Sequence, residues 1–196
     1  MVLFRTVTIF FGGLVFLFSC HSCGSRVLID NGKIPDSILA FVPYQNGQSY
    51  QFRHSAGLVI RFSSARQSRE EWSLCPEYCK YETKYEVNST TLTPDYPVFN
   101  FECDLSNLDT VHLSLTAIVG HYWFHIPIND YQSNYCDFAD SVLIGKKYYH
   151  DVFKIKSDYG FAWDRDTIFA DSMYYSYRHG IIQVMMSNGE KYTIYE

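Results

Sequence analysis

The chain has 196 residues and a net charge of −5 at pH 7, with 21 acidic and 16 basic side chains. No cluster of basic residues is longer than Lys146-Lys147, so we expect no nucleic-acid partner. About 175 residues follow the apolar N-terminal segment, which is enough for one domain with a substantial core. We therefore predict a single β-rich domain over residues 27–196.

The N-terminal segment predicts export. Met1 to Arg5 carries one positive side chain, and Val7 to Phe18 is an apolar run interrupted only by a threonine and two glycines. A run of this length is typical of the hydrophobic region of an export signal. Because residues 6–25 carry no charge, a membrane-spanning anchor of about 20 residues is the second interpretation.

The end of this run, Leu17-Phe18-Ser19-Cys20, resembles the bacterial lipobox, in which a branched apolar residue and a small residue precede an invariant cysteine. The resemblance implies cleavage before Cys20, a diacylglyceryl group on its thiol and a stable lipid anchor. It gives a signal peptide over 1–19 and a tether over 20–26. The bulky residues before Cys20 disfavour the alternative, an ordinary cleavage site with a free thiol. His21, where many lipoproteins of the inner membrane have aspartate, favours the outer membrane of the cell envelope.

Cysteine usage fits an oxidising compartment. Cys23 lies in the tether, and the four remaining cysteines, Cys75, Cys79, Cys103 and Cys136, allow three disulfide pairings. One pairing closes a short loop between Cys75 and Cys79 and joins Cys103 to Cys136, and the other two stay open. A metal site is the competing interpretation of Cys-x3-Cys, but no second ligand pair at zinc spacing exists, so we expect no metal.

The aromatic and β-branched residues predict strands joined as consecutive hairpins. Asn46-Gly47 is expected to connect a strand over 38–44 with one over 49–53, because both residues of this dipeptide tolerate the positive φ of a tight hairpin turn. Ala56-Gly57 is expected to turn the second strand into a third over 58–63.

The middle of the chain gives weaker signals. Residues 64–72 lack an apolar stripe and are interpreted as a solvated loop or one helical turn, and Asn88-Ser89-Thr90-Thr91 marks an irregular segment. Strict alternation over 99–105 and 111–119 then predicts a hairpin. Four further strands are expected over 166–169, 173–177, 181–186 and 191–195. We predict an all-β antiparallel meander, built as a sandwich or an open half-barrel.

The segment from Gly120 to Pro127 is the first candidate for ligand binding. It contains His121, Trp123 and His125, which on a strand would share one face, with the histidines about 13 Å apart and too distant to share a metal. Such a stripe could stack against a sugar or a peptide. The plainer interpretation is a strand whose outer face is simply aromatic.

Sequence motifs of catalysis are absent: the chain holds no Gly-x-Ser-x-Gly, no His-Glu-x-x-His and no glycine-rich phosphate loop. His150 and Asp151 are adjacent, which on a regular strand directs them to opposite faces. Asp130, Asp137 and Asp140 lack the spacing of an EF-hand and are interpreted as polar turns. We therefore predict no catalytic residue and no cofactor.

Five triplets of aspartate, serine or threonine, and an apolar residue resemble the O-glycosylation acceptor motif of exported Bacteroidetes proteins. The resemblance implies these acceptors: Ser37, Thr110, Ser141, Thr167 and Ser172. The same triplet is also a natural entry from a turn into a strand.

With the lipobox and these triplets, the segments Phe41–Gly47 and Ser176–Ile182 make the chain similar to the small uncharacterised lipoproteins of Bacteroidetes. The similarity implies membrane attachment and β structure, and it brings no known activity.

Taken together, these features predict a lipid-anchored envelope protein that acts as a non-catalytic binding or structural module. Its expected partners are the membrane and a glycan, a peptide or an envelope protein. One alternative is a hydrolase of envelope or dietary polymers that uses His121, His125 or the scattered aspartates. Another is a carrier of hydrophobic ligands, which needs a cavity lined by inner-face residues such as Phe101 and Leu115.

Overall fold

The computed structural model describes residues 27–74, 81–108, 113–128, 136–158 and 168–195. Its one helix, α2, is a single turn, and the other elements are twelve strands. Their bounds are β1 Val27–Asp30, α2 Asp36–Leu39, β2 Ser49–His54, β3 Val59–Leu74, β4 Tyr81–Pro94, β5 Phe101–Ser106, β6 Ser114–Val119, β7 Tyr122–Ile126, β8 Cys136–Ile144, β9 Lys147–Lys156, β10 Ala170–Ser176, β11 Gly180–Met186 and β12 Lys191–Ile194. The predicted all-β class is confirmed.

The strands form one sheet in the order β7-β6-β5-β4-β3-β2-β12-β11-β10-β9-β8. Strands β2 to β7 pair antiparallel in chain order, as do β8 to β12, while β7 and β8 lie at opposite ends of this order and β12 pairs antiparallel with β2. The short β1 adds to this meander by pairing parallel with β4. The sheet therefore consists of two antiparallel meanders, β2 to β7 and β8 to β12, which are joined by the pairing of β12 with β2. This arrangement confirms the predicted antiparallel meander.

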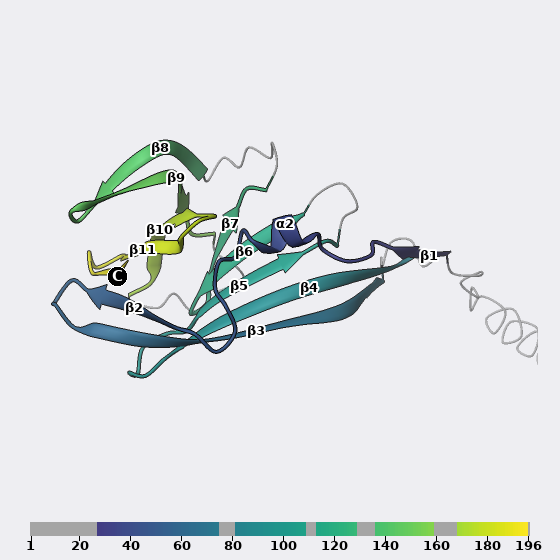
Figure 1. Cartoon of the computed structure of the whole chain (residues 1–196), viewed down its shortest axis with the longest axis horizontal. Helices are drawn as coiled ribbons and strands as arrows, with labels where there is room; N and C mark the ends of the chain where they lie inside the picture. Colours follow the sequence, from purple (N-terminus) through teal and green to yellow (C-terminus); the bar gives the residue numbers. More distant parts are fainter. Residues whose placement is uncertain (1–26, 75–80, 109–112, 129–135, 159–167, 196) are drawn as a thin grey trace, which may run out of the picture.

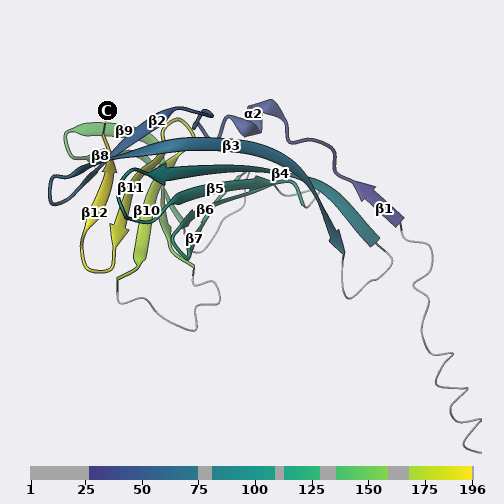
Figure 2. The same cartoon turned by 90° about the horizontal axis from the view of Figure 1, so that it is seen from below.

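The sheet curls into a nearly closed half-barrel (Figures 1 and 2). Beyond the end of β9, Asp158 forms an isolated bridge with Trp123 on β7, and its amide donates a 2.8 Å hydrogen bond to the Trp123 carbonyl. This bridge brings the β7 edge of the sheet to the opposite meander. Of the two predicted architectures, the half-barrel is the one formed.

Alternation along the strands places the core on the concave side. Phe101, Cys103 and Leu105 on β5 face inward, as do Leu115 and Ala117 on β6. The hairpin predicted over 99–105 and 111–119 is confirmed for the residues described, with every second side chain buried.

Residues 34–44 cross this concave side as a strap, in which Ile34, Val42 and Tyr44 are buried in the core cluster. The backbone N–H of Ile181 donates a 2.6 Å hydrogen bond to the Tyr44 hydroxyl, and the Tyr175 hydroxyl donates one of 2.6 Å to the Phe41 carbonyl. The concave side is therefore filled by side chains and by the strap, which gives no support to the predicted carrier.

The strap replaces the strand predicted over 38–44, and that prediction is wrong. Only α2 and turns lie there, so Asn46-Gly47 does not close a hairpin. The Asn-Gly signal requires two strands that pair with each other, whereas the strap carbonyls of Leu39 and Val42 accept hydrogen bonds from the Arg66 guanidinium. The hairpin turn at Ala56-Gly57 is confirmed, with Gly57 at φ 94°.

The interpretations of 64–72 as a loop or helical turn and of Asn88–Thr91 as irregular are also wrong. Both segments lie in β3 and β4, which pair over thirteen residues and extend beyond β5 to β7 as a ribbon (Figure 2). Much of the part beyond β5 is solvated on both faces, so it needs no apolar stripe, and cross-strand pairs such as Lys84 with Glu70 join its strands.

In the C-terminal region, β10, β11 and β12 confirm three of the predicted strands. Ile168 and Phe169 lie outside any strand, which contradicts the described part of the strand predicted over 166–169. The turns before Gly180 and at Gly189 are confirmed, and both glycines have positive φ. Within the described residues, no helix is long and apolar enough to span a membrane.

Candidate ligand-binding site

A pocket of about 380 Å³ lies where β8, β9 and the β10–β11 turn meet. Three aromatic rings form its wall, with ring centroids 5.3 Å apart for Phe138 and Phe153 and 5.1 Å apart for Phe153 and Tyr177. Tyr177 in turn stacks on Phe41 of the strap at 4.0 Å. The remaining lining residues are polar: His150, Asp151, Ser176, Arg178 and His179. We call this the aromatic pocket.

The backbone of β9 explains how the pocket is assembled. Asp151 has φ 53°, the left-handed conformation that aspartate tolerates better than most residues. The irregularity breaks the period of two, so His150 and Phe153 line the same pocket although they are three residues apart. Tyr149 and Val152 pack together on the other side of the sheet.

This irregularity corrects the prediction that His150 and Asp151 point to opposite faces, because both line the aromatic pocket. A regular strand separates adjacent side chains, and a residue with positive φ does not follow that rule. Aspartate adjacent to histidine carries no signal for a left-handed residue, so the sequence could not reveal that both residues line one pocket.

The chemistry of the aromatic pocket is that of a binding surface. The Tyr177 hydroxyl donates a hydrogen bond to the Pro127 carbonyl, and burial raises the pKa of Tyr177 to about 12, so the phenol is neutral at pH 7. Rings supply stacking area, while Arg178 and the histidines supply polar groups at the edge. Small-ligand sites commonly combine aromatic walls with polar groups that fix the orientation of the ligand.

The predicted stripe of His121, Trp123 and His125 is only partly assembled. Trp123 and His125 lie on the outward face of β7 with ring centroids 6.4 Å apart, and Trp123 is 43% exposed. His121 is exposed in the β6–β7 turn rather than on the strand. The stripe therefore contributes two neighbouring rings on an open surface.

His125 lies between two polar side chains. Its Nδ1 is 3.2 Å from the Thr116 hydroxyl, and its Nε2 is 3.7 Å from the Asp158 carboxylate. A hydroxyl, an imidazole and a carboxylate are the groups of a catalytic triad, but both His125 and Asp158 are about half exposed. Such exposure gives little of the desolvated, preorganised surroundings on which catalysis depends.

The expected bridge between Cys103 and Cys136 is wrong, because both thiols are free. Cys103 is buried in the core on β5, whereas Cys136 starts β8 at the far edge of the sheet. Burial raises the pKa of the Cys136 thiol to about 11 and that of Cys103 further, so neither is a thiolate nucleophile at pH 7. Cys75 and Cys79 lie outside the described residues.

The candidate glycosylation sites divide by exposure. Ser37 on α2 and Ser141 on β8 are exposed, so both could be modified in the folded protein. Ser172 on β10 is only 4% exposed, which removes it as an acceptor once the chain has folded. Thr110 and Thr167 lie outside the described residues, and so do Cys20 and the predicted tether.

Among the described residues, no three histidine, cysteine, aspartate or glutamate side chains are placed to hold a metal ion. Comparisons of the chain with protein-family models, with curated proteins and with solved structures find no match.

Proposed function

We propose that the protein is a lipid-anchored module of the cell envelope that binds a ligand without converting it, and that the aromatic pocket holds this ligand. The observation that carries the proposal is the pocket itself, a row of three rings beside a polar edge. A sugar ring or an aromatic peptide side chain would stack on these rings while the edge bonds its polar groups.

Phe138 is the residue to change, because it is 56% exposed and can lose its ring without opening the core. We expect Phe138→Ala to weaken ligand binding about two- to tenfold, the loss of one stacking contact. The ligand would first be identified by screening the purified mature chain against envelope glycans, peptides and lipids, and its affinity then measured by calorimetry.

Tyr148→Ala is the matched control, because Tyr148 is an aromatic residue on the same hairpin that is 63% exposed and does not line the pocket. Equal losses for the two variants would remove the pocket from the proposal. A screen that finds no ligand would contradict the binding function itself.

The anchor is tested by mass spectrometry of the protein purified from its native membrane. We expect the first peptide to begin at Cys20 and to carry lipid, and peptides with the exposed Ser37 or Ser141 to carry hexose. An unmodified chain that keeps residues 1–19 would contradict the anchor and would favour a signal-anchored protein.

A hydrolase is the second candidate function, and the contact of His125 with Thr116 and Asp158 is the observation that favours it. It requires turnover of an envelope polymer that His125→Ala abolishes and that replacement of the exposed turn residue His121 leaves intact. A wild-type chain without turnover would remove it.

A further inference from the structure

A second hollow, of about 750 Å³, lies on the face of the sheet opposite the core, between the tip of the β8–β9 hairpin and strands β2, β11 and β12. The hairpin is held there by a small apolar cluster of Ile144, Tyr149, Val152 and Ile182. Burial of such side chains contributes about 1.5 to 3 kcal/mol each, which keeps the hairpin over the sheet. We call this hollow the basic groove.

The charge of the basic groove is opposite to that of the protein. The chain has five more acidic than basic residues, yet four of the fourteen residues lining the groove are lysine or arginine and none is acidic. These four are Arg53, Lys146, Lys147 and Lys191. Concentrated charge of one sign in a hollow attracts ligands of the other sign.

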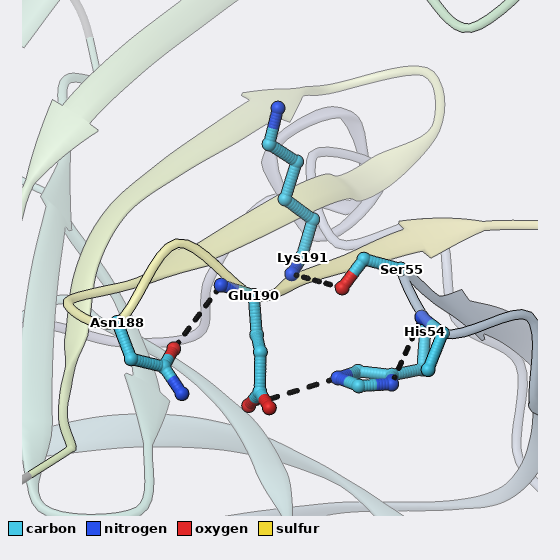
Figure 3. A network of polar contacts seen from close by, with 6 residues as sticks. His54, Ser55, Asn188, Glu190 and Lys191 are labelled. Atoms are coloured by element: carbon cyan, nitrogen blue, oxygen red, sulfur yellow. Dashed lines mark hydrogen bonds and ion pairs between the residues drawn. The ribbon is translucent and has the colours of Figure 1, made fainter.

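Glu190, the acidic residue that precedes Lys191 in the chain, is already engaged. Glu190 directs its carboxylate at the His54 imidazole, 3.7 Å away, while the Lys191 side chain extends away from both (Figure 3). In the part of the chain that the structure describes, Lys146 and Lys191 form no ion pair with the protein. Their charges are therefore available to a ligand.

The neutral residues of the groove suit a ligand rich in hydroxyl groups. Ser55 and Thr193 carry hydroxyls, and Gln183, which also lines the groove, donates a 2.7 Å hydrogen bond to the Thr193 hydroxyl through its side-chain amide. Side chains of this kind bind hydroxyl groups as both donors and acceptors.

The aromatic residues argue against stacked nucleobases. Arg53 lies 4.0 Å from the centroid of the Tyr195 ring and covers that face, and Tyr149 is only 4% exposed. Proteins that bind single-stranded nucleic acid present open aromatic faces along a basic track. The overall negative charge also opposes a long, densely charged polyanion.

We infer that the basic groove binds a linear glycan that carries carboxylate groups, such as a uronic-acid polymer. The lysine and arginine side chains of the groove would pair with the carboxylates of the glycan. Ser55, Gln183 and Thr193 would form hydrogen bonds with the glycan hydroxyls between those carboxylates. The inference does not rest on the aromatic pocket, because the two hollows share no lining residue.

The test measures binding of the full mature chain to immobilised polygalacturonate by surface plasmon resonance. We expect saturable binding that weakens with added salt, since exposed charge pairs are screened. Replacing both hairpin-tip lysines by glutamate (Lys146→Glu with Lys147→Glu) should lower the affinity at least about tenfold, because two attractions become repulsions.

Lys154→Glu with Lys156→Glu is the matched control. It changes the net charge equally on the same hairpin, at exposed residues outside the groove, and should change the affinity less than about threefold. Equal losses in both double variants would show nonspecific attraction and overturn the inference.

Three further probes separate the ligand classes. A neutral polymer such as dextran should not bind, poly-glutamate should bind more weakly than polygalacturonate because it lacks hydroxyls, and single-stranded DNA should bind least. Equal binding of poly-glutamate, or tighter binding of DNA, would overturn the assignment to a glycan. Neither result bears on Phe138→Ala, so failure here is distinguishable from failure of the proposed function.

Discussion

Replacing Arg66 by methionine should lower the free energy of unfolding by about 3 kcal/mol, because partly buried acceptors lose the hydrogen bonds of its guanidinium. The Arg66 guanidinium donates hydrogen bonds of 2.8 Å to the Leu39 carbonyl, 3.0 Å to the Val42 carbonyl and 2.8 Å to the Asn88 amide oxygen. Burial lowers the pKa of Arg66, but arginine stays charged at neutral pH. Methionine keeps the apolar stem but leaves the Val42 carbonyl and the Asn88 amide oxygen without a partner, while the Leu39 carbonyl keeps only the 3.3 Å hydrogen bond from the Val42 N–H.

Urea denaturation measures the loss, and hydrogen exchange locates it, because the amides of residues 36–44 should lose protection before those of β11. Arg66→Lys should be intermediate, since an ammonium group cannot bond three acceptors in the same fixed plane. Arg69→Met is the control: Arg69 is an exposed residue of the same strand that pairs with Glu71, and its loss should cost under about 1 kcal/mol. Similar losses for Arg66→Met and Arg69→Met would refute the role of Arg66 in holding the strap.

The second large effect is expected at Gly180, which begins β11. Its φ is +70°, and a Cβ added there would lie 2.4 Å from the Tyr44 hydroxyl oxygen and 2.5 Å from the ring carbon that carries it. Gly180→Ala should therefore destabilise the fold by about 3 kcal/mol, the sum of the left-handed backbone cost and the overlap with a fully buried side chain.

Gly189→Ala separates these two contributions. Gly189 also has a positive φ, +88°, but nothing lies within 4 Å of an added Cβ, so only the backbone cost of about 1 to 2 kcal/mol is expected. Thermal unfolding followed by circular dichroism compares the variants. If both lose the same stability, the close approach of Tyr44 to Gly180 does not restrict the turn.

The accuracy of sequence-based prediction followed the local pattern of each segment. The strands with strict alternation, such as 99–105, were predicted with the correct inward face, because one side of the sheet is buried there. The β3–β4 ribbon was missed because both of its faces are partly solvated, and polar residues then carry no period. At Asn46-Gly47 the local signal was present, but the predicted hairpin did not form. The dipeptide permits a hairpin turn, whereas the strap before it forms its hydrogen bonds with Arg66 and Tyr175 rather than with a neighbouring strand.

The candidate site was less predictable than the fold. Trp123 and His125 were identified because an aromatic residue and a histidine at outward positions of a strand are visible in the sequence. The aromatic pocket was not, since Phe138 on β8, Phe153 on β9 and Tyr177 in the β10–β11 turn meet only through the pairing of these strands. The basic groove was hidden in the same way: Arg53 and Lys147 are almost one hundred residues apart in the chain.

The sequence by itself determined the class of the fold and the meander, because hydrophobic alternation and turn residues act over a few neighbouring positions. It also supplied the segment Leu17–Cys20, whose resemblance to a lipobox is the basis of the proposed anchor, since such a motif is contiguous. Only the tertiary structure decided that the sheet closes through β12 and β2, that a strap fills its concave side and that two separate hollows flank the β8–β9 hairpin. Each of these features joins residues distant in the chain, where the packing of whole elements, rather than local preference, sets the free energy.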